Sequence, residues 1–263
     1  MHKSNGGFGF WDSEKEKVIS MYLDKKMSTN DIGKIYGCYG TTVLLHLKRW
    51  NVEIRKERYN SKYSVDVLCF DAIDDEYKAY FLGLLLADGH ISKHNTIMLT
   101  MKDADVVEKW KSFLNTDAPI KIDKHGNYYL NIVCKRIADR LKEIGFNNRK
   151  SYHVDFDRII GNVPESLMHH FLRGLFDGDG SIRIYNYPYL KKPQLHFGIT
   201  GLPNVVQFFK EYLGITTKTV KESDITHTCV SACRETIIKS FKTLYKDATV
   251  YMERKYETFK SIV

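Results

Sequence analysis

Apolar and polar positions in the first 50 residues follow the helical period in three successive segments. The first covers Asp12–Leu23, the second begins at Ser28, and the third runs from about Thr41 to Trp50. Ser28 and Asp31 have the spacing of a capping box variant, and Gly37 is placed to end the second helix with a positive φ. We therefore expect a small all-α domain at residues 1–58.

The second and third of these helices resemble a helix-turn-helix, in which the last helix enters the major groove of DNA. Its candidate DNA-binding residues are Thr41, Thr42, His46, Lys48 and Arg49. An ordinary three-helix bundle with a solvated basic face has the same pattern, so the two interpretations stay open. Residues 59–73 are expected to be a linker, and Arg55 just before it is either a phosphate contact or part of a solvated tether.

The remaining residues contain an internal repeat. Asp105 of the first copy aligns with Asn204 of the second, and the apolar positions that follow them align as well. Each copy has the pattern helix, two strands, helix, two strands, helix, which predicts units at residues 74–160 and 161–263. The second copy has about eight extra residues in its first hairpin, around residues 185–192.

Alternating residues in the predicted strands give each sheet one apolar and one polar face. Ile97, Leu99 and Met101 oppose Thr100 and Lys102 in the first copy. The candidate DNA-binding residues of the repeat are Lys93, Thr100, Lys102, Arg183, Tyr185, Gln194, His196 and Thr200. These residue types pair with base edges and phosphates, although alternation by itself shows only that a face is exposed.

The first helix of each copy carries the same nine-residue pattern, FLGLLLADG at residues 81–89 and LRGLFDGDG at residues 172–180. Small residues recur four apart, so each helix offers a groove where another backbone can approach. These helix-interface residues are Gly83, Ala87, Gly174 and Gly178. The two helices are therefore expected to pack on each other.

Both nine-residue segments end in Asp-Gly, and Gly89 and Gly180 are expected to be left-handed C-terminal residues. The aspartates, Asp88 and Asp179, need another explanation, because a carboxylate at the negative end of a helix dipole costs about 0.3–1 kcal/mol. A divalent cation between the helix ends would reverse that sign. Position six of the pattern is Leu86 in one copy and Asp177 in the other, so Asp88 and Asp179 are the better ligand candidates.

Net charge is +8, and residues 1–62 carry +5 of it, which favours a polyanionic partner. Five cysteines without a paired Cys-x-x-Cys spacing predict reduced thiols in an intracellular compartment. The sequence contains no apolar run long enough to span a membrane, and its first residues do not follow the pattern of a signal peptide. We therefore expect a protein that is neither membrane-bound nor secreted.

The two nine-residue segments resemble the motif that names the LAGLIDADG homing endonucleases, and the likeness extends over residues 77–263. The first motif departs from the pattern at Phe81, Leu82 and Leu86, the second at Arg173 and Gly178, and both keep the eighth-position acid. The resemblance implies an α+β fold in which two pseudo-symmetric αββαββα units form a saddle over double-stranded DNA. It also implies active sites beneath the motif helices and a monomer without an obligate protein partner.

Phosphodiester hydrolysis needs an activated water and neutralised phosphate charge, which divalent metals supply. Asp88 and Asp179, with main-chain oxygens of Ala87 and Gly178, form a sparse oxygen set that suits Mg²⁺ or Mn²⁺. Lys150 and Lys255, near the ends of the two copies, are candidate catalytic residues, although surface lysines in ion pairs or in solvent would have the same pattern.

The sequence therefore predicts a metal-dependent, site-specific endonuclease that cuts both strands of duplex DNA at a long recognition site. Two alternatives use the same fold. One is a DNA-binding regulator without cleavage activity, and the other is an RNA-splicing maturase that binds intron RNA.

Overall fold

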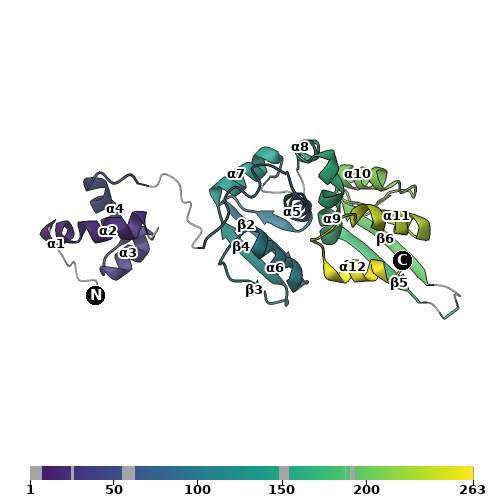
Figure 1. The fold of residues 1–263 in the computed structure, drawn as a ribbon, viewed down its shortest axis with the longest axis horizontal. Helices are drawn as coiled ribbons and strands as arrows, with labels where there is room; N and C mark the ends of the chain where they lie inside the picture. Colours follow the sequence, from purple (N-terminus) through teal and green to yellow (C-terminus); the bar gives the residue numbers. More distant parts are fainter. Residues whose placement is uncertain are drawn as a thin grey trace. The chain divides into compact units, whose positions relative to one another are not determined.

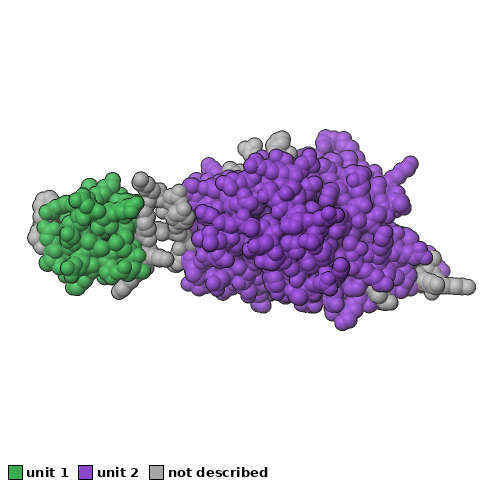
Figure 2. All heavy atoms as spheres, turned by 45° about the horizontal axis from the view of Figure 1, so that its top comes forward, with its two compact units in different colours: residues 1–60 green, residues 61–263 purple. Residues whose placement is uncertain are grey.

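The structure is a computed structural model that describes residues 8–24, 27–54, 63–147, 154–186, 188–189 and 193–262. Contacts divide the chain into one unit of residues 1–60 and another of residues 61–263, which Figure 2 colours separately. Each unit has its own core of buried apolar residues, because the two clusters share no member. No described helix is long and apolar enough to cross a lipid bilayer.

The N-terminal unit contains four short helices. They are α1 (Phe8–Ser13), α2 (Lys15–Leu23), α3 (Thr29–Ile35) and α4 (Gly40–Arg49). The prediction of a single first helix at Asp12–Leu23 is wrong, because the helix is interrupted at Glu14. There the Ser13 hydroxyl donates to the Phe10 carbonyl at 2.8 Å, and the Glu14 carboxylate accepts from the Tyr36 hydroxyl at 3.0 Å.

The turn between α3 and α4 follows the sequence prediction. Ser28 Oγ accepts a hydrogen bond from the Asp31 N–H at 3.1 Å, which confirms the predicted N-terminal cap of α3. Gly37 has a φ of +67°, as expected where a helix ends. A Cβ at Gly40 would lie 2.8 Å from the Asn30 backbone nitrogen, so α4 begins in close contact with the start of α3.

The second unit contains the two predicted αββαββα copies, each with one further helix (Figure 1). The first copy comprises α5 (Glu76–Ala87), β1 (Gly89–Ile91), β2 (Thr96–Met101), α6 (Ala104–Phe113), β3 (Lys121–Ile122), β4 (Tyr128–Val133), α7 (Lys135–Ile144) and α8 (Phe156–Gly161). The second comprises the 3₁₀ turn η1 (Glu165–Leu167), α9 (Met168–Asp179), β5 (Gly180–Tyr185), β6 (Gln194–Gly201), α10 (Pro203–Leu213), β7 (Val220–Lys221), β8 (His227–Ser231), α11 (Arg234–Leu244) and α12 (Glu253–Lys260).

Each copy forms a four-stranded antiparallel sheet. The strand orders are β1-β2-β4-β3 and β5-β6-β8-β7, so the two sheets share one topology. Helices α6 and α7 pack on the first sheet, and α10 and α12 pack on the second. Buried and half-buried residues alternate along β2, and the apolar residues that point inward join one continuous core built from both copies.

Helices α5 and α9 pack side by side and join the two copies (Figure 1). Their contact is a backbone approach at two glycines. A Cβ at Gly83 would lie 1.9 Å from the Phe171 carbonyl oxygen, and a Cβ at Gly174 would lie 1.9 Å from the Tyr80 carbonyl oxygen. Only glycine leaves room for both helices at this distance.

The left-handed conformation expected at Gly89 and Gly180 is wrong. Neither glycine has a positive φ, and Gly180 is extended with φ −83° and ψ 162°. Each begins a strand that folds back over the last helical turn. A Cβ would then lie 2.5 Å from Leu85 Cδ2 at position 89 and 2.2 Å from Phe176 Cδ2 at position 180. Space, and not backbone conformation, requires glycine here.

Candidate active site

The motif aspartates lie where the two central helices end. Asp88 caps the C-terminus of α5, Asp179 is the last residue of α9, and both are exposed. A Cβ at Gly178 would lie 2.2 Å from the Ala87 Cβ, so the two helix ends meet at these small residues. Each aspartate lines a separate cavity beside this contact.

The Asp88 cavity has a volume of about 460 Å³ and draws residues from both copies. Its charged lining residues are Asp88, Lys102, Asp103, Asp177, Arg183, Arg254 and Lys255. Thr100, Lys102, Ser181 and Arg183 lie on the polar faces of the two sheets, so the cavity is continuous with those faces. It combines carboxylates with cations beside a surface that is open to a large ligand.

The Asp179 cavity has a volume of about 330 Å³ and a different lining. Around Asp179 it presents the hydroxyls of Thr200 and Thr226 and the apolar side chains of Leu86, Leu175, Leu202 and Val205. Asp179 is its single charged lining residue within the described part of the chain.

Asp177 is a buried anchor. It is 1% exposed, and its Oδ2 accepts from the Tyr80 hydroxyl and the Met252 N–H, both at 2.8 Å. Burial raises the pKa of Asp177 above its usual value, although Lys255 and the Met252 N–H act in the opposite direction. Asp177 therefore fixes the segment before α12 and is not presented to a ligand as Asp88 is.

Lys255 is placed beside the catalytic candidates but is held by the main chain. Its ammonium donates to the carbonyl oxygens of Phe176, Asp177 and Gly180 at 2.7, 2.7 and 2.6 Å. Burial lowers the pKa of Lys255 to about 8, against the attraction of Asp177. The ammonium thus caps the C-terminal carbonyls of α9 and offsets the negative helix end that the sequence argument assigned to a metal. All three of its N–H donors are used in this cap.

The other basic groups differ in how they are held. Arg254 makes a two-point ion pair with Asp103 at 2.9 and 3.0 Å, and this hydrogen-bonded pair raises the pKa of Arg254. Lys102 is exposed and has no ion pair with a described residue. Lys150, the second predicted catalytic lysine, lies outside the described residues.

The oxygen atoms at Asp88 fit a hydrated divalent cation. Among the described residues, no group of three or more His, Cys, Asp or Glu side chains is placed to hold a metal. Mg²⁺ commonly uses only one or two carboxylates and keeps several waters. A Cβ at Gly178 would lie 3.0 Å from Asp88 Oδ2, so the glycine leaves space beside this carboxylate. This small, oxygen-only donor set suits Mg²⁺ or Mn²⁺ better than a metal that needs a full protein cage.

The polar face of the second sheet brings together most of the predicted strand residues. Register pairs Arg183 with His196 and Tyr185 with Gln194. Arg183 donates to the Tyr185 hydroxyl at 3.3 Å, and the Tyr185 and His196 rings lie 5.0 Å apart. Thr200 is exposed and hydrogen-bonds to Thr228 of β8 at 2.6 Å, a neighbour that the sequence analysis did not name.

The first sheet adds two residues that the sequence analysis missed. Thr100 pairs with Tyr129 of β4, and Met98 pairs with Asn131, so Tyr129 and Asn131 share the polar face. The signal was present, since Leu130 and Ile132 are buried and alternate with them. Lys93 is exposed in the β1–β2 hairpin.

The predicted DNA-binding residues of α4 differ in how exposed their side chains are. Thr41, Lys48 and Arg49 are exposed, and Thr42 is half-buried. The His46 ring instead stacks on buried Trp11 at 4.5 Å between centroids, so it belongs to the aromatic cluster of this unit. Arg49 also pairs with Asp12 at 3.3 Å. Arg55 lies outside the described residues.

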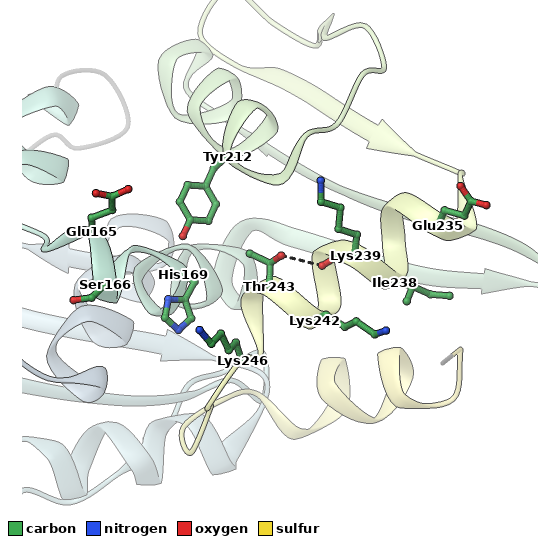
Figure 3. A pocket seen from close by; sticks show the side chains of 10 residues that line it. All are labelled: Glu165, Ser166, His169, Tyr212, Glu235, Ile238, Lys239, Lys242, Thr243 and Lys246. Carbon is green, nitrogen blue, oxygen red and sulfur yellow. Dashed lines mark hydrogen bonds between the residues drawn. The ribbon is translucent and has the colours of Figure 1, made fainter.

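A third hollow of about 740 Å³ lies over the helices of the second copy (Figure 3). It is lined by Glu165, Ser166, His169, Tyr212, Glu235, Ile238, Lys239, Lys242, Thr243 and Lys246. It contains neither motif aspartate and no residue of either sheet. Although this hollow has a larger volume than the two aspartate cavities, it lacks the residues expected at the active site.

Comparison with known proteins identifies this arrangement. Residues 75–145 match the family model described as LAGLIDADG-like domain. The fold is similar to the I-LtrWI LAGLIDADG homing endonuclease bound to target DNA, with a TM-score of 0.52 and 16% identity over 71% of this chain and 89% of that one. Residues 75–145 thus carry a LAGLIDADG-like domain, and the second unit has the fold of a LAGLIDADG homing endonuclease. A second LAGLIDADG-type structure, the meganuclease I-SmaMI bound to uncleaveable DNA, has a TM-score of 0.51 and 13% identity over 70% of this chain and 88% of that one.

Two curated relatives come from Methanocaldococcus jannaschii. An uncharacterized protein is 30% identical over 179 residues, which cover 64% of this chain and 66% of the relative. Reverse gyrase is 25% identical over 228 residues, which cover 82% of this chain and 13% of the enzyme. The chain thus spans only part of each relative. At their low identities, the likeness to the solved structures concerns the fold.

Proposed function

We propose that this LAGLIDADG chain is a site-specific endonuclease that hydrolyses both strands of duplex DNA with Mg²⁺ or Mn²⁺. One observation carries the proposal. Asp88 and Asp179 end the two central helices, and each lines its own cavity beside residues of a polar sheet face. Two such sites, one at each motif aspartate, match the two scissile phosphates of a duplex.

Each group has a separate part in the proposal. Asp88 and Asp179, with main-chain oxygens at Ala87 and Gly178, would hold the cation, which when bound activates a water molecule and neutralises phosphate charge. The polar sheet faces would hold the duplex through side chains such as Arg183, and exposed basic groups would neutralise its backbone. Helix α4 would lengthen the recognised site through Thr41 and Lys48, as in a helix-turn-helix.

Cleavage selection from a randomised duplex library in Mg²⁺ tests the proposal and supplies the target. We expect a long preferred sequence, cleavage of both strands and loss of cleavage in EDTA. Asp88→Asn and Asp179→Asn should abolish duplex cleavage while gel-shift binding to the selected target is retained. Asp224→Asn is a matched control, because Asp224 is an exposed acid in the β7–β8 turn that, within the described part of the chain, forms its ion pair with Lys221 at 2.8 Å.

Other outcomes would favour the alternatives. Sequence-specific duplex binding without cleavage in either metal would favour a regulator. Tight binding to intron RNA, combined with no nuclease activity, would favour a maturase. Full duplex cleavage by Asp88→Asn and Asp179→Asn would show that these aspartates are not the metal ligands.

A further inference from the structure

The two cavities at the motif aspartates are pseudo-symmetric images of each other. Strand register fixes the correspondence, since Gly89 pairs with Leu99 in the first sheet and Gly180 pairs with Ile199 in the second. Thr100 therefore corresponds to Thr200, and two residues further along this register Lys102 corresponds to Leu202. The repeat alignment of Asp105 with Asn204 differs by one residue, because α10 begins one residue earlier than α6 relative to the strand register. Most residues that line the Asp179 cavity have their counterparts in the Asp88 cavity.

Matched positions carry different chemistry in the two cavities. The pairs, with the Asp88 cavity first, are Asp88 and Asp179, Asp177 and Leu86, Gly178 and Ala87, Thr100 and Thr200, Met101 and Gly201, Lys102 and Leu202, and Asn127 and Thr226. Arg183 corresponds to Ser92, which does not line the Asp179 cavity. Asp88 and Asp179 occupy matched positions, whereas Lys102 of the Asp88 cavity is matched by the apolar Leu202 in the Asp179 cavity.

Of the other cations of the Asp88 cavity, Lys255 and Arg254 are committed to carbonyl or carboxylate groups, and Arg183 donates to the Tyr185 hydroxyl on the sheet face at 3.3 Å. Lys255 uses its three donors on main-chain carbonyls, and Arg254 is paired with Asp103. Lys102 is exposed and has no such partner among the described residues. Its ammonium is therefore the group best placed to approach a phosphate in that cavity. The residues around Lys150, which correspond to the segment that carries Lys255, lie outside the described residues.

We infer that the two sites work at unequal rates, and that Lys102 makes the strand at the Asp88 cavity the first to be cut. This inference rests on the proposed endonuclease function. Charge grows on the phosphate oxygens as the phosphodiester bond breaks, and a nearby ammonium stabilises that charge. Removing one fixed stabilising donor in a dry site slows a reaction about 10²- to 10³-fold. Because Lys102 is exposed to solvent, which screens its charge, we expect an effect of about tenfold.

A single-turnover assay on the selected duplex, with a different fluorophore on each 5′ end, measures both strand rates in the full chain. The unaltered chain should cut one strand about tenfold faster and accumulate nicked duplex. Lys102→Leu should slow that strand about tenfold and leave the other within about twofold, while Lys102→Arg should retain most of the rate. Leu202→Lys should accelerate the other strand. Lys239→Leu, which removes a lysine in the Figure 3 hollow, should leave the ratio of rates unchanged.

The outcomes separate this inference from the function on which it rests. Equal strand rates in the unaltered chain, or equal slowing of both strands by Lys102→Leu, would overturn the inference and leave the endonuclease intact. Absence of cleavage of either strand would overturn both. Melting temperatures of all variants identify any that fail to fold. If Lys102→Leu is one of them, Leu202→Lys decides, because an unchanged second strand would refute a charge effect at this position.

Discussion

Gly83 of α5 lies so close to α9 that a Cβ at position 83 would be 1.9 Å from the carbonyl oxygen of Phe171. Gly174 has the reciprocal relationship with the Tyr80 carbonyl. These contacts hold the two helices together along their length, and their ends meet at Ala87 and Gly178, next to Asp88 and Asp179. The distance between the copies is thus set by two residues that have no side chain.

Alanine at either glycine should force the two helices apart. We expect Gly83→Ala and Gly174→Ala each to lower the free energy of unfolding by about 1–3 kcal/mol, the usual cost of overpacking. Urea denaturation followed by circular dichroism measures it. Gly161→Ala in α8 is the control, because a Cβ there meets nothing within 4 Å. If Gly83→Ala and Gly174→Ala unfold at the same urea concentration as Gly161→Ala, this account of the helix contact is wrong.

Lys255 should stabilise the fold independently of any catalytic role. Lys255→Met leaves the carbonyls of Phe176, Asp177 and Gly180 without their donor, and we expect a loss of about 2–3 kcal/mol. Lys260→Met, which removes an exposed lysine of the same helix, should change stability by less than about 0.5 kcal/mol. Chemical denaturation compares them. Equal stability of the two variants would show that the helix cap contributes nothing.

The buried ion pair between Arg173 and Glu76 links α9 to α5. Arg173 is fully buried, and its Nη2 lies 2.6 Å from Glu76 Oε1. Arg173→Met should destabilise the fold by about 3–5 kcal/mol, because it leaves a carboxylate without its cation. Adding Glu76→Gln should recover part of that loss. A double-mutant cycle measures the coupling, and strict additivity of the two changes would refute it.

His170 should make the protein sensitive to mild acid. Its Nδ1 lies 2.7 Å from Arg173 Nη1, and burial, followed by the charge of Arg173, lowers the pKa of His170 to about 4. Between pH about 4 and 6.5 the unfolded chain binds a proton here that the folded chain does not. The contribution of His170 to the free energy of unfolding is therefore fully present above pH 6.5 and decreases as the pH falls toward 4.

Replacement of the imidazole tests this. His170→Gln keeps an acceptor for Arg173 but does not titrate, so its unfolding midpoint should fall less than that of the unaltered chain between pH 7 and 5. Glu76 does not mask the effect. Burial opposes its ionisation, but hydrogen bonds from Thr249 and Val250 and the charge of Arg173 lower the pKa of Glu76 overall, which shifts its titration further from the compared range of pH 7 to 5. Parallel pH profiles would rule out His170 as the source.

The N-terminal unit should contribute to DNA binding without being needed for the second fold. The two units have separate cores, so residues 61–263 alone should show a cooperative unfolding transition. Loss of the basic unit removes phosphate contacts, and we expect affinity for the selected target to fall by about one to two orders of magnitude, with a shallower salt dependence. Lys48→Ala in the full chain should shift affinity in the same direction. Unchanged affinity and salt dependence in the shortened chain would argue for a helical bundle without a DNA role.

The sequence by itself determined the repeated architecture. Hydrophobic periodicity is a local property, so it located the two copies, the alternating strand faces and the cap at Ser28. The eighth-position aspartates could be chosen because the two copies could be compared. Period-two alternation also marked Tyr129 and Asn131, although only the pairing of β2 with β4 showed which strand residues they adjoin.

Tertiary structure decided how those residues are used, because contacts between distant segments are not encoded in local spacing. It showed that Gly89 and Gly180 are required by space over the preceding helical turn, that His46 stacks on Trp11, and that Lys255 caps α9. It also placed Lys102 and Leu202 at matched positions of two cavities, each of which draws residues from both halves of the chain. That difference depends on strand register and on the packing of α5 against α9, and neither can be read from one segment alone.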